Sequence, residues 1–280
     1  MTGRVDAHHH VWQLARGDYG WLQPVPELAP IFRDFGLDEL SPLIAAAGID
    51  ATVLVQAAPT VAETRFLLGI AQRSAGLVRG VVGWVDLDAD DAPEALAALA
   101  GDSRLKSIRP MLQDLADPQW LLRPAVRRSL AALLPLGLRF DALVKARELK
   151  PLLRALELQP DLAVVVDHCA KPDIAGGAWR PWADDLARIA RYTSAACKLS
   201  GLATEAGPGW TVDGLRRYVD HVLECFGPER LMWGSDWPVL TLAASYGQWV
   251  AATDALLRDV PPAARHAILG ENARRFYGLG

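Results

Sequence analysis

A repeated unit constrains the fold of this chain more than any other feature. Eight β-rich runs recur along the sequence, and a segment with apolar residues at helical spacing follows each one. The β-rich runs are 5–11, 52–57, 80–87, 107–111, 139–144, 163–168, 197–202 and 231–237. The helical segments are 37–47, 61–75, 92–100, 118–134, 146–158, 181–192, 212–226 and 243–257. A doubly wound open sheet also alternates in this way, but eight β/α units favour a closed (β/α)8 barrel.

Two stretches lie outside the alternation. Residues 13–36 carry Trp21 and three prolines, and an excursion of this length after a strand is typical of a lid or binding loop. A final helix is expected from Pro261 to Tyr277. Because no Gly-, Ser- or Pro-rich boundary divides the chain, we expect one domain over residues 1–280, with an inserted loop after the first strand and a C-terminal helix.

Composition limits the partners and the compartment. The chain is 51% hydrophobic, which excludes intrinsic disorder, and its net charge of −4 gives no reason to expect nucleic acid or a membrane surface as a partner. Its three cysteines form no CxxC pair, which favours a reducing compartment. No apolar run approaches a membrane span, and strand-like sequence begins at Arg4, leaving no room for a signal peptide. We therefore expect a cytoplasmic protein.

Polar residues stand where three of the expected strands end. His8 and His10 lie two residues apart and share a face of the first strand, His168 ends the sixth, and Asp236 ends the eighth. Active sites of barrels are built at these carboxyl ends. Three imidazoles and a carboxylate converging there would suit a divalent metal such as zinc, or an acid/base site.

Each of these residues also has a structural interpretation. His168 alone could be a hydrogen-bonded core histidine, Asp236 could cap a turn, and three consecutive histidines can come from an affinity tag. Here the three histidines are embedded in strand sequence, and the residues fall together at strands one, six and eight. Their joint placement favours a site.

Other strand ends supply candidates for substrate binding. Arg109 could hold a carboxylate or carbonyl oxygen with its forked donors, or form a structural ion pair. Tryptophans next to the expected mouth could stack on a sugar-like ring, although most tryptophans are core residues. The remaining polar strand ends could recognise hydroxyl groups or anchor loops. The full set of substrate-binding candidates is Arg109, Gln56, Asp141, Lys198, Trp21 and Trp237.

Six motifs carry a family resemblance. They are DAHHHVW, IRPMLQD, VVVDHCAKP, CKLSGLATEA, RLMWGSDWPV and ILGENARRFYGL, and they cover nearly the whole chain in order. Together they resemble the amidohydrolase superfamily, and within it the branch of sugar-lactone and pyrone-lactone hydrolases. The resemblance implies a distorted (β/α)8 barrel.

The resemblance also implies a metal site, with departures. Its metal ligands fall on His8, His10, His168 and Asp236, but Asp141 stands where many members have a fifth-strand histidine. Arg109 stands where binuclear members keep a bridging lysine. We therefore expect one divalent ion, zinc before others, which could also be dispensable because this branch includes members that work without metal. No organic cofactor is expected.

The activity that the resemblance implies is opening of the lactone of a sugar acid, such as L-fuconolactone or a related aldonolactone. Asp236 would activate water, and His168, Arg109 or a metal would stabilise the oxyanion. Three alternatives remain open: an aromatic-derived pyrone or muconolactone-type lactone as substrate, a metal-dependent decarboxylase, and a catalytically silent barrel that binds a ligand. A homo-oligomer also remains open.

Overall fold

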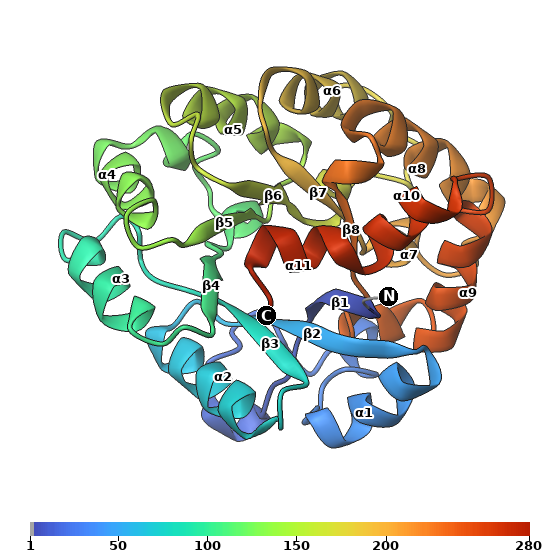
Figure 1. Ribbon diagram of the computed structural model, residues 1–280, viewed down its shortest axis with the longest axis horizontal. Helices are drawn as coiled ribbons and strands as arrows, with labels where there is room; N and C mark the ends of the chain where they lie inside the picture. Colours follow the sequence, from blue (N-terminus) through green and yellow to red (C-terminus); the bar gives the residue numbers. More distant parts are fainter. Residues whose placement is uncertain (1–2) are drawn as a thin grey trace.

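Eight parallel strands form the centre of the molecule (Figure 1), which a computed structural model describes for residues 3–280. The strands are β1 (Arg4–His9), β2 (Ile49–Val55), β3 (Val78–Gly83), β4 (Leu105–Ile108), β5 (Arg139–Ala142), β6 (Val164–Val166), β7 (Ala196–Leu199) and β8 (Leu231–Trp233). Each pairs with the next in chain order. The segment after β8 returns to β1 through Asp236 N–H to His8 O (2.8 Å) and His10 N–H to Trp237 O (2.7 Å). The expected (β/α)8 barrel is therefore confirmed.

Helices surround the strands as an outer ring (Figure 1). The helices that follow the eight strands in turn are α1 (Leu37–Ala46), α2 (Val61–Arg73), α3 (Ala92–Ala100), α4 (Pro124–Leu133), α5 (Ala146–Leu158), α6 (Trp182–Tyr192), α8 (Val212–Phe226) and α9 (Tyr246–Leu256). The short helix α7 (Leu202–Ala206) precedes α8, and α10 (Pro262–His266) and α11 (Asn272–Tyr277) end the chain. Each helix of the ring buries one apolar stripe against the strands; α6, for example, buries Leu186 and Ile189. No helix among residues 3–280 is long and apolar enough to cross a membrane.

Several elements are shorter than the sequence predicted. The expected helix 118–134 is a 3₁₀ turn at Trp120–Leu122 followed by α4, because Arg123, which precedes a proline, is extended. β6 ends at Val166 and β8 at Trp233, so the polar residues expected at their ends lie just beyond the sheet. The expected final helix is interrupted by a π-helical turn at Ala267–Glu271.

The excursion 13–36 is tied to the barrel mouth. Trp12 and Phe35 exchange backbone hydrogen bonds of 3.1 and 3.0 Å, which close the base of the excursion. The indole N–H of Trp21 donates to the carbonyl of Ala57, just after β2, at 2.7 Å. The excursion therefore lies over the carboxyl ends of the strands.

The C-terminal helix closes the opposite end of the barrel. Figure 1 shows α11 across the ring of strands. Tyr277 of α11 is fully buried in a cluster with Val5, Val53 and other inward-facing strand residues. Its hydroxyl donates to Asp141 Oδ2 at 2.7 Å. The side chains of this cluster fill the end of the barrel next to α11. The other end, the mouth at the carboxyl ends of the strands, is left for a site.

Candidate active site

A buried carboxylate clamps the junction where β8 returns to β1. The Asp6 carboxylate accepts three hydrogen bonds. Two come from Ser235, from its backbone N–H at 2.8 Å and its hydroxyl at 2.6 Å, and the third comes from the Tyr246 hydroxyl at 2.9 Å. Burial raises the pKa of Asp6 to about 6, although these hydrogen bonds lower it. The clamp fixes the backbone immediately before Asp236. Sequence reasoning missed Asp6, whose position inside the first strand gave no sign of this role.

The four predicted metal ligands converge at this junction. Asp236 Oδ1 lies 3.3 Å from His10 Nε2, 3.7 Å from His8 Nε2 and 3.8 Å from His168 Nε2. All four side chains are buried. The structure thus brings together one carboxylate and three imidazoles, from β1, from the residue that follows it and from the segments after β6 and β8.

The backbone at this cluster adopts unfavourable conformations. His168 has φ 51° and Asp236 has φ 60°, in the left-handed region that residues other than glycine seldom occupy. Such conformations cost about 1–3 kcal/mol each and cluster at functional sites. Gly234 faces His8 so closely that an added Cβ would lie 2.7 Å from the His8 Cβ. The left-handed backbone of His168 and Asp236, together with the close contact between Gly234 and His8, directs these side chains toward one point.

The hydrogen bonds of His10 define which of its ring nitrogens is free. Its Nδ1 lies 2.8 Å from the Val55 carbonyl, which can only accept, so Nδ1 carries the proton. Nε2 of the neutral ring is then a lone pair, and it faces Asp236 Oδ1 and His8 Nε2 at 3.3 Å each. The His10 lone pair and the Asp236 carboxylate are both acceptors, and at 3.3 Å they need a proton or a metal ion between them.

The electrostatics of the cluster suit a metal ion. Burial lowers the pKa of His168 to about 4 and that of His8 well below its usual value, so both rings are neutral at pH 7. Burial alone would raise the pKa of Asp236, but the surrounding histidines outweigh it and lower that pKa. Neutral imidazoles and an ionised carboxylate are the ligand types of zinc. His8, His10 and Asp236 offer ligand atoms within 4.8 Å of one another.

Lys198 lies beneath these ligands. It is fully buried, and its Nζ contacts Asp141 Oδ2 at 2.6 Å, Asp167 Oδ1 at 3.0 Å and His8 Nδ1 at 3.0 Å. Neither Lys198 nor Asp141 is among the lining residues of the active-site cavity described below, and their contact with substrate stays a prediction. Both residues sit within strands, below the mouth, and act as supports for His8.

Arg109 links this support to the mouth. Its Nη1 lies 3.3 Å from both His8 Nε2 and Asp167 Oδ2, and its Nη2 donates to the Gln56 carbonyl. The Gln56 amide in turn donates to the Arg109 carbonyl at 2.6 Å. Gln56 is fully buried, so it holds Arg109 rather than reaching the space above. Arg109 is 3% exposed and lines the cavity described next.

A cavity of about 320 Å³ opens above the cluster. We call it the active-site cavity; its lining residues are His10, Trp21, Leu28, Ala57, Arg109, Met111, Gln113, Asp114, Leu143, His168, Lys171, Asp236, Val239 and Leu242. Trp21 lines it as expected, whereas Trp237 is 2% exposed and packs edge-on against Phe35. Sequence reasoning did not single out Gln113, although it lies in the IRPMLQD motif. Gln113 Oε1 is buried without a hydrogen-bond partner among the described residues.

The fold and the site together define a class: (β/α)8 barrels whose active centre is an HxH pair on the first strand with a histidine and an aspartate from later strands. The chain belongs to the amidohydrolase family, whose model, described as Amidohydrolase, matches residues 5–279. It is 46% identical to an L-fucono-1,5-lactonase of Burkholderia ambifaria, over 100% of this chain and 97% of the relative.

Two further relatives agree with this assignment. An L-fucono-1,5-lactonase of Burkholderia multivorans is 36% identical over 99% of this chain and 96% of its own length. The crystal structure of an amidohydrolase from Burkholderia multivorans, with bound zinc, superposes with a TM-score of 0.93 at 34% identity and 100% coverage of both chains.

Proposed function

We propose that this protein hydrolyses the 1,5-lactone of a sugar acid, L-fucono-1,5-lactone or a closely related aldonolactone. The observation that carries the proposal is the 46% identity, over the whole chain, to an L-fucono-1,5-lactonase. The second such relative, at 36% identity, supports the same reaction.

The lining of the active-site cavity supports a neutral substrate. Its formal charges balance, with Arg109 and Lys171 against Asp114 and Asp236. A dicarboxylate substrate would place its anionic groups near Asp114 and Asp236, where repulsion disfavours it. The uncharged part of the lining combines Trp21 with the amide of Gln113, and this mixture suits a ring that has both C–H faces and hydroxyl groups.

The chemistry would be direct attack of water on the ester carbonyl. The low pKa of Asp236 keeps the carboxylate ionised, so it can take a proton from the attacking water as the new C–O bond forms. Arg109, with its guanidinium at the cavity floor, would bind the carbonyl oxygen as negative charge develops there. The protonated Asp236 then returns its proton to the ring oxygen as the ring C–O bond breaks, which releases the hydroxy acid.

His8, His10, His168 and Asp236 would hold one divalent ion, zinc before others. When bound, it supplies Lewis acidity to the ester carbonyl. The zinc-bound Burkholderia multivorans structure supports this choice. In this chain, the His10 lone pair that faces Asp236 fits a bound divalent ion.

A panel of lactones tests the proposal. The purified protein, with zinc added, is assayed by pH indicator on L-fucono-1,5-lactone, its stereoisomeric aldonolactones and a pyrone dicarboxylate. We expect acid release from L-fucono-1,5-lactone or a close stereoisomer, and no release of CO₂ from aromatic carboxylic acids. Acid release from the pyrone alone, or from no lactone, would contradict the proposal.

A further inference from the structure

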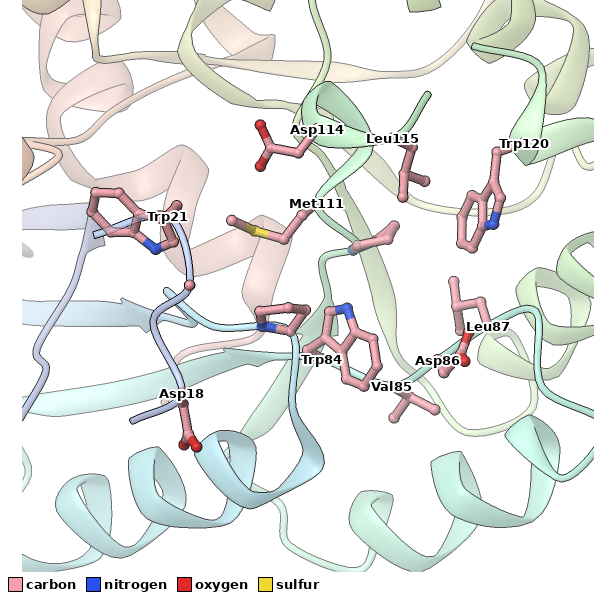
Figure 2. Close-up of a pocket in the computed structure, with 13 residues that line it drawn as sticks. Asp18, Trp21, Trp84, Val85, Asp86, Leu87, Met111, Asp114, Leu115 and Trp120 are labelled. Carbon is pink, nitrogen blue, oxygen red and sulfur yellow. The ribbon is translucent and has the colours of Figure 1, made fainter. Parts of the chain in front are cut away.

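A second cavity lies beside the active-site cavity, with a volume of about 540 Å³. Its lining residues are Asp18, Gly20, Trp21, Pro59, Trp84, Val85, Asp86, Leu87, Pro110, Met111, Asp114, Leu115 and Trp120. Trp21, Met111 and Asp114 line both cavities, so the two spaces adjoin. Figure 2 shows these three residues toward one side of the second cavity, with Trp120 at the other.

Hydrogen bonds fix the indole of one of its aromatic walls and the backbone of another. The indole of Trp21 donates to Ala57 O at 2.7 Å. The backbone N–H of Trp84 donates to the Thr64 hydroxyl at 2.8 Å, and that hydroxyl donates to the Trp84 carbonyl at 2.9 Å. The indole N–H of Trp84 itself donates to no acceptor in the described part of the chain and is free for a ligand. The backbone of Trp84 is therefore fixed, and its side chain lines the cavity with a face on which a ring can stack.

The charged residues that line the second cavity are all acidic. Three carboxylates line it, from Asp18, Asp86 and Asp114, and no Lys, Arg or His is among its lining residues. Asp18 is paired with Arg16 at 2.5 Å, whereas neither Asp86 nor Asp114 has an ion-pair partner among residues 3–280. Carboxylate oxygens accept hydrogen bonds from hydroxyl groups and repel anions. Tryptophan faces with carboxylates and no cations suit a neutral polyhydroxylated ring.

We propose that the second cavity is a subsite for a neutral sugar ring attached to the lactone, so that the substrates include lactones of glycosylated sugar acids. This inference rests on the proposed function. A lactone ring in the active-site cavity would contact Trp21 and Asp114, and a substituent on its hydroxyl groups would pass these residues into the second cavity. Trp84 would then stack on the attached ring.

Matched substrates test the subsite. L-Fucono-1,5-lactone is compared with three derivatives that carry one neutral hexosyl group at O-2, O-3 or O-4, and with the same three bearing a uronosyl group instead. The measured quantity is kcat/KM in the parental protein, in Trp84→Ala and in Trp210→Ala. Trp210 lines neither cavity, and its indole donates to Ala243 O at 3.0 Å, so it is the control tryptophan.

The inference predicts two results together. At least one hexosyl derivative reaches or exceeds the kcat/KM of the parent lactone, and its uronosyl counterpart is slower. Trp84→Ala then lowers kcat/KM for that hexosyl derivative about 10-fold or more, a typical value for lost pocket contacts. The same variant hydrolyses the parent lactone at close to the normal rate, which shows that it is folded, and Trp210→Ala has no selective effect.

Other patterns overturn it. If the parent lactone is hydrolysed but no hexosyl derivative matches it, or if Trp84→Ala slows both substrates by the same factor, the subsite does not exist. A uronosyl derivative that is as fast as the hexosyl one would also contradict it. If neither the parent lactone nor any derivative is hydrolysed, the proposed function itself fails and the subsite falls with it.

Discussion

The Nε2 of His10 lies 3.3 Å from Asp236 Oδ1, while the other ring nitrogen of His10 donates to the Val55 carbonyl at 2.8 Å. The backbone of β2 thus selects the His10 tautomer that leaves a lone pair facing the carboxylate. Metal-binding histidines are commonly held this way, with the second nitrogen on a carbonyl or carboxylate.

Zinc binding should depend on this lone pair. We expect the protein, after removal of metal, to bind one Zn²⁺ in a calorimetric titration. His10→Ala should weaken the affinity by more than the ~10–100-fold that losing an outer partner costs, because a ligand atom is removed. His221→Ala is the control, since His221 lies on α8 and contacts Ala183 O at 3.0 Å. Unchanged affinity in His10→Ala would exclude the site.

Arg109 should bind the carbonyl oxygen both in the bound substrate and in the transition state, as negative charge develops there. Arg109→Met removes a charged donor set at the cavity floor, so we expect KM for the lactone to rise about 10-fold or more, as loss of a charged hydrogen bond implies. Arg109→Lys should recover part of this, because a lysine keeps the charge but not the fork. Steady-state kinetics measure both variants. If KM and kcat are both unchanged in Arg109→Met, Arg109 has a purely structural role.

Lys198 should matter for stability. Lys198→Met leaves Asp141 and Asp167 buried without the cation that contacts both, so we expect the free energy of unfolding to fall by about 3–5 kcal/mol. Denaturant titration measures this. Lys150→Met is the control, because the Lys150 side chain is 67% exposed and its change should stay within about 0.5 kcal/mol. Equal effects for the two variants would refute the supporting role of Lys198.

Glu63 should make stability depend on pH. Its carboxylate accepts the backbone N–H groups of Ala57 and Ala58, and burial raises its pKa from 4.5 to about 7. Between these values the folded protein keeps a proton that the unfolded chain has lost. The contribution of Glu63 to the free energy of unfolding is therefore largest below pH 4.5. It declines as the pH rises through about 7, by at most about 3 kcal/mol.

Glu63→Gln should remove this dependence. We expect the stability of the parental protein relative to Glu63→Gln to be greater at pH 5 than at pH 8, as measured by denaturant titration at both values. A relative stability that is the same at both pH values would contradict the raised pKa of Glu63.

The sequence predicted the fold because strand and helix periodicities repeat eight times. It also predicted that His8, His10, His168 and Asp236 would meet, since the carboxyl ends of parallel strands share one edge. The position of each side chain along the barrel axis was less predictable. Lys198 lies inside β7, so its side chain points into the packed interior below the mouth.

Loop residues were the least predictable part of the site. Trp237 was expected near substrate, but its backbone pairs with His9 in a parallel bridge and its ring packs on Phe35 of the excursion 13–36. Trp120 and Trp84 both line the second cavity although they belong to different β/α connections. The course of such connections depends on tertiary contacts that no local pattern encodes.

The central claim is that Asp236 activates water for attack on a sugar lactone. The most direct measurement is kcat for L-fucono-1,5-lactone in Asp236→Asn and in the parental protein, both loaded with zinc and checked for folding by circular dichroism. The account predicts a fall of about 10²–10⁴-fold in kcat with an unchanged spectrum. A kcat within about twofold of the parental value would contradict it, because no base at this position would then be needed.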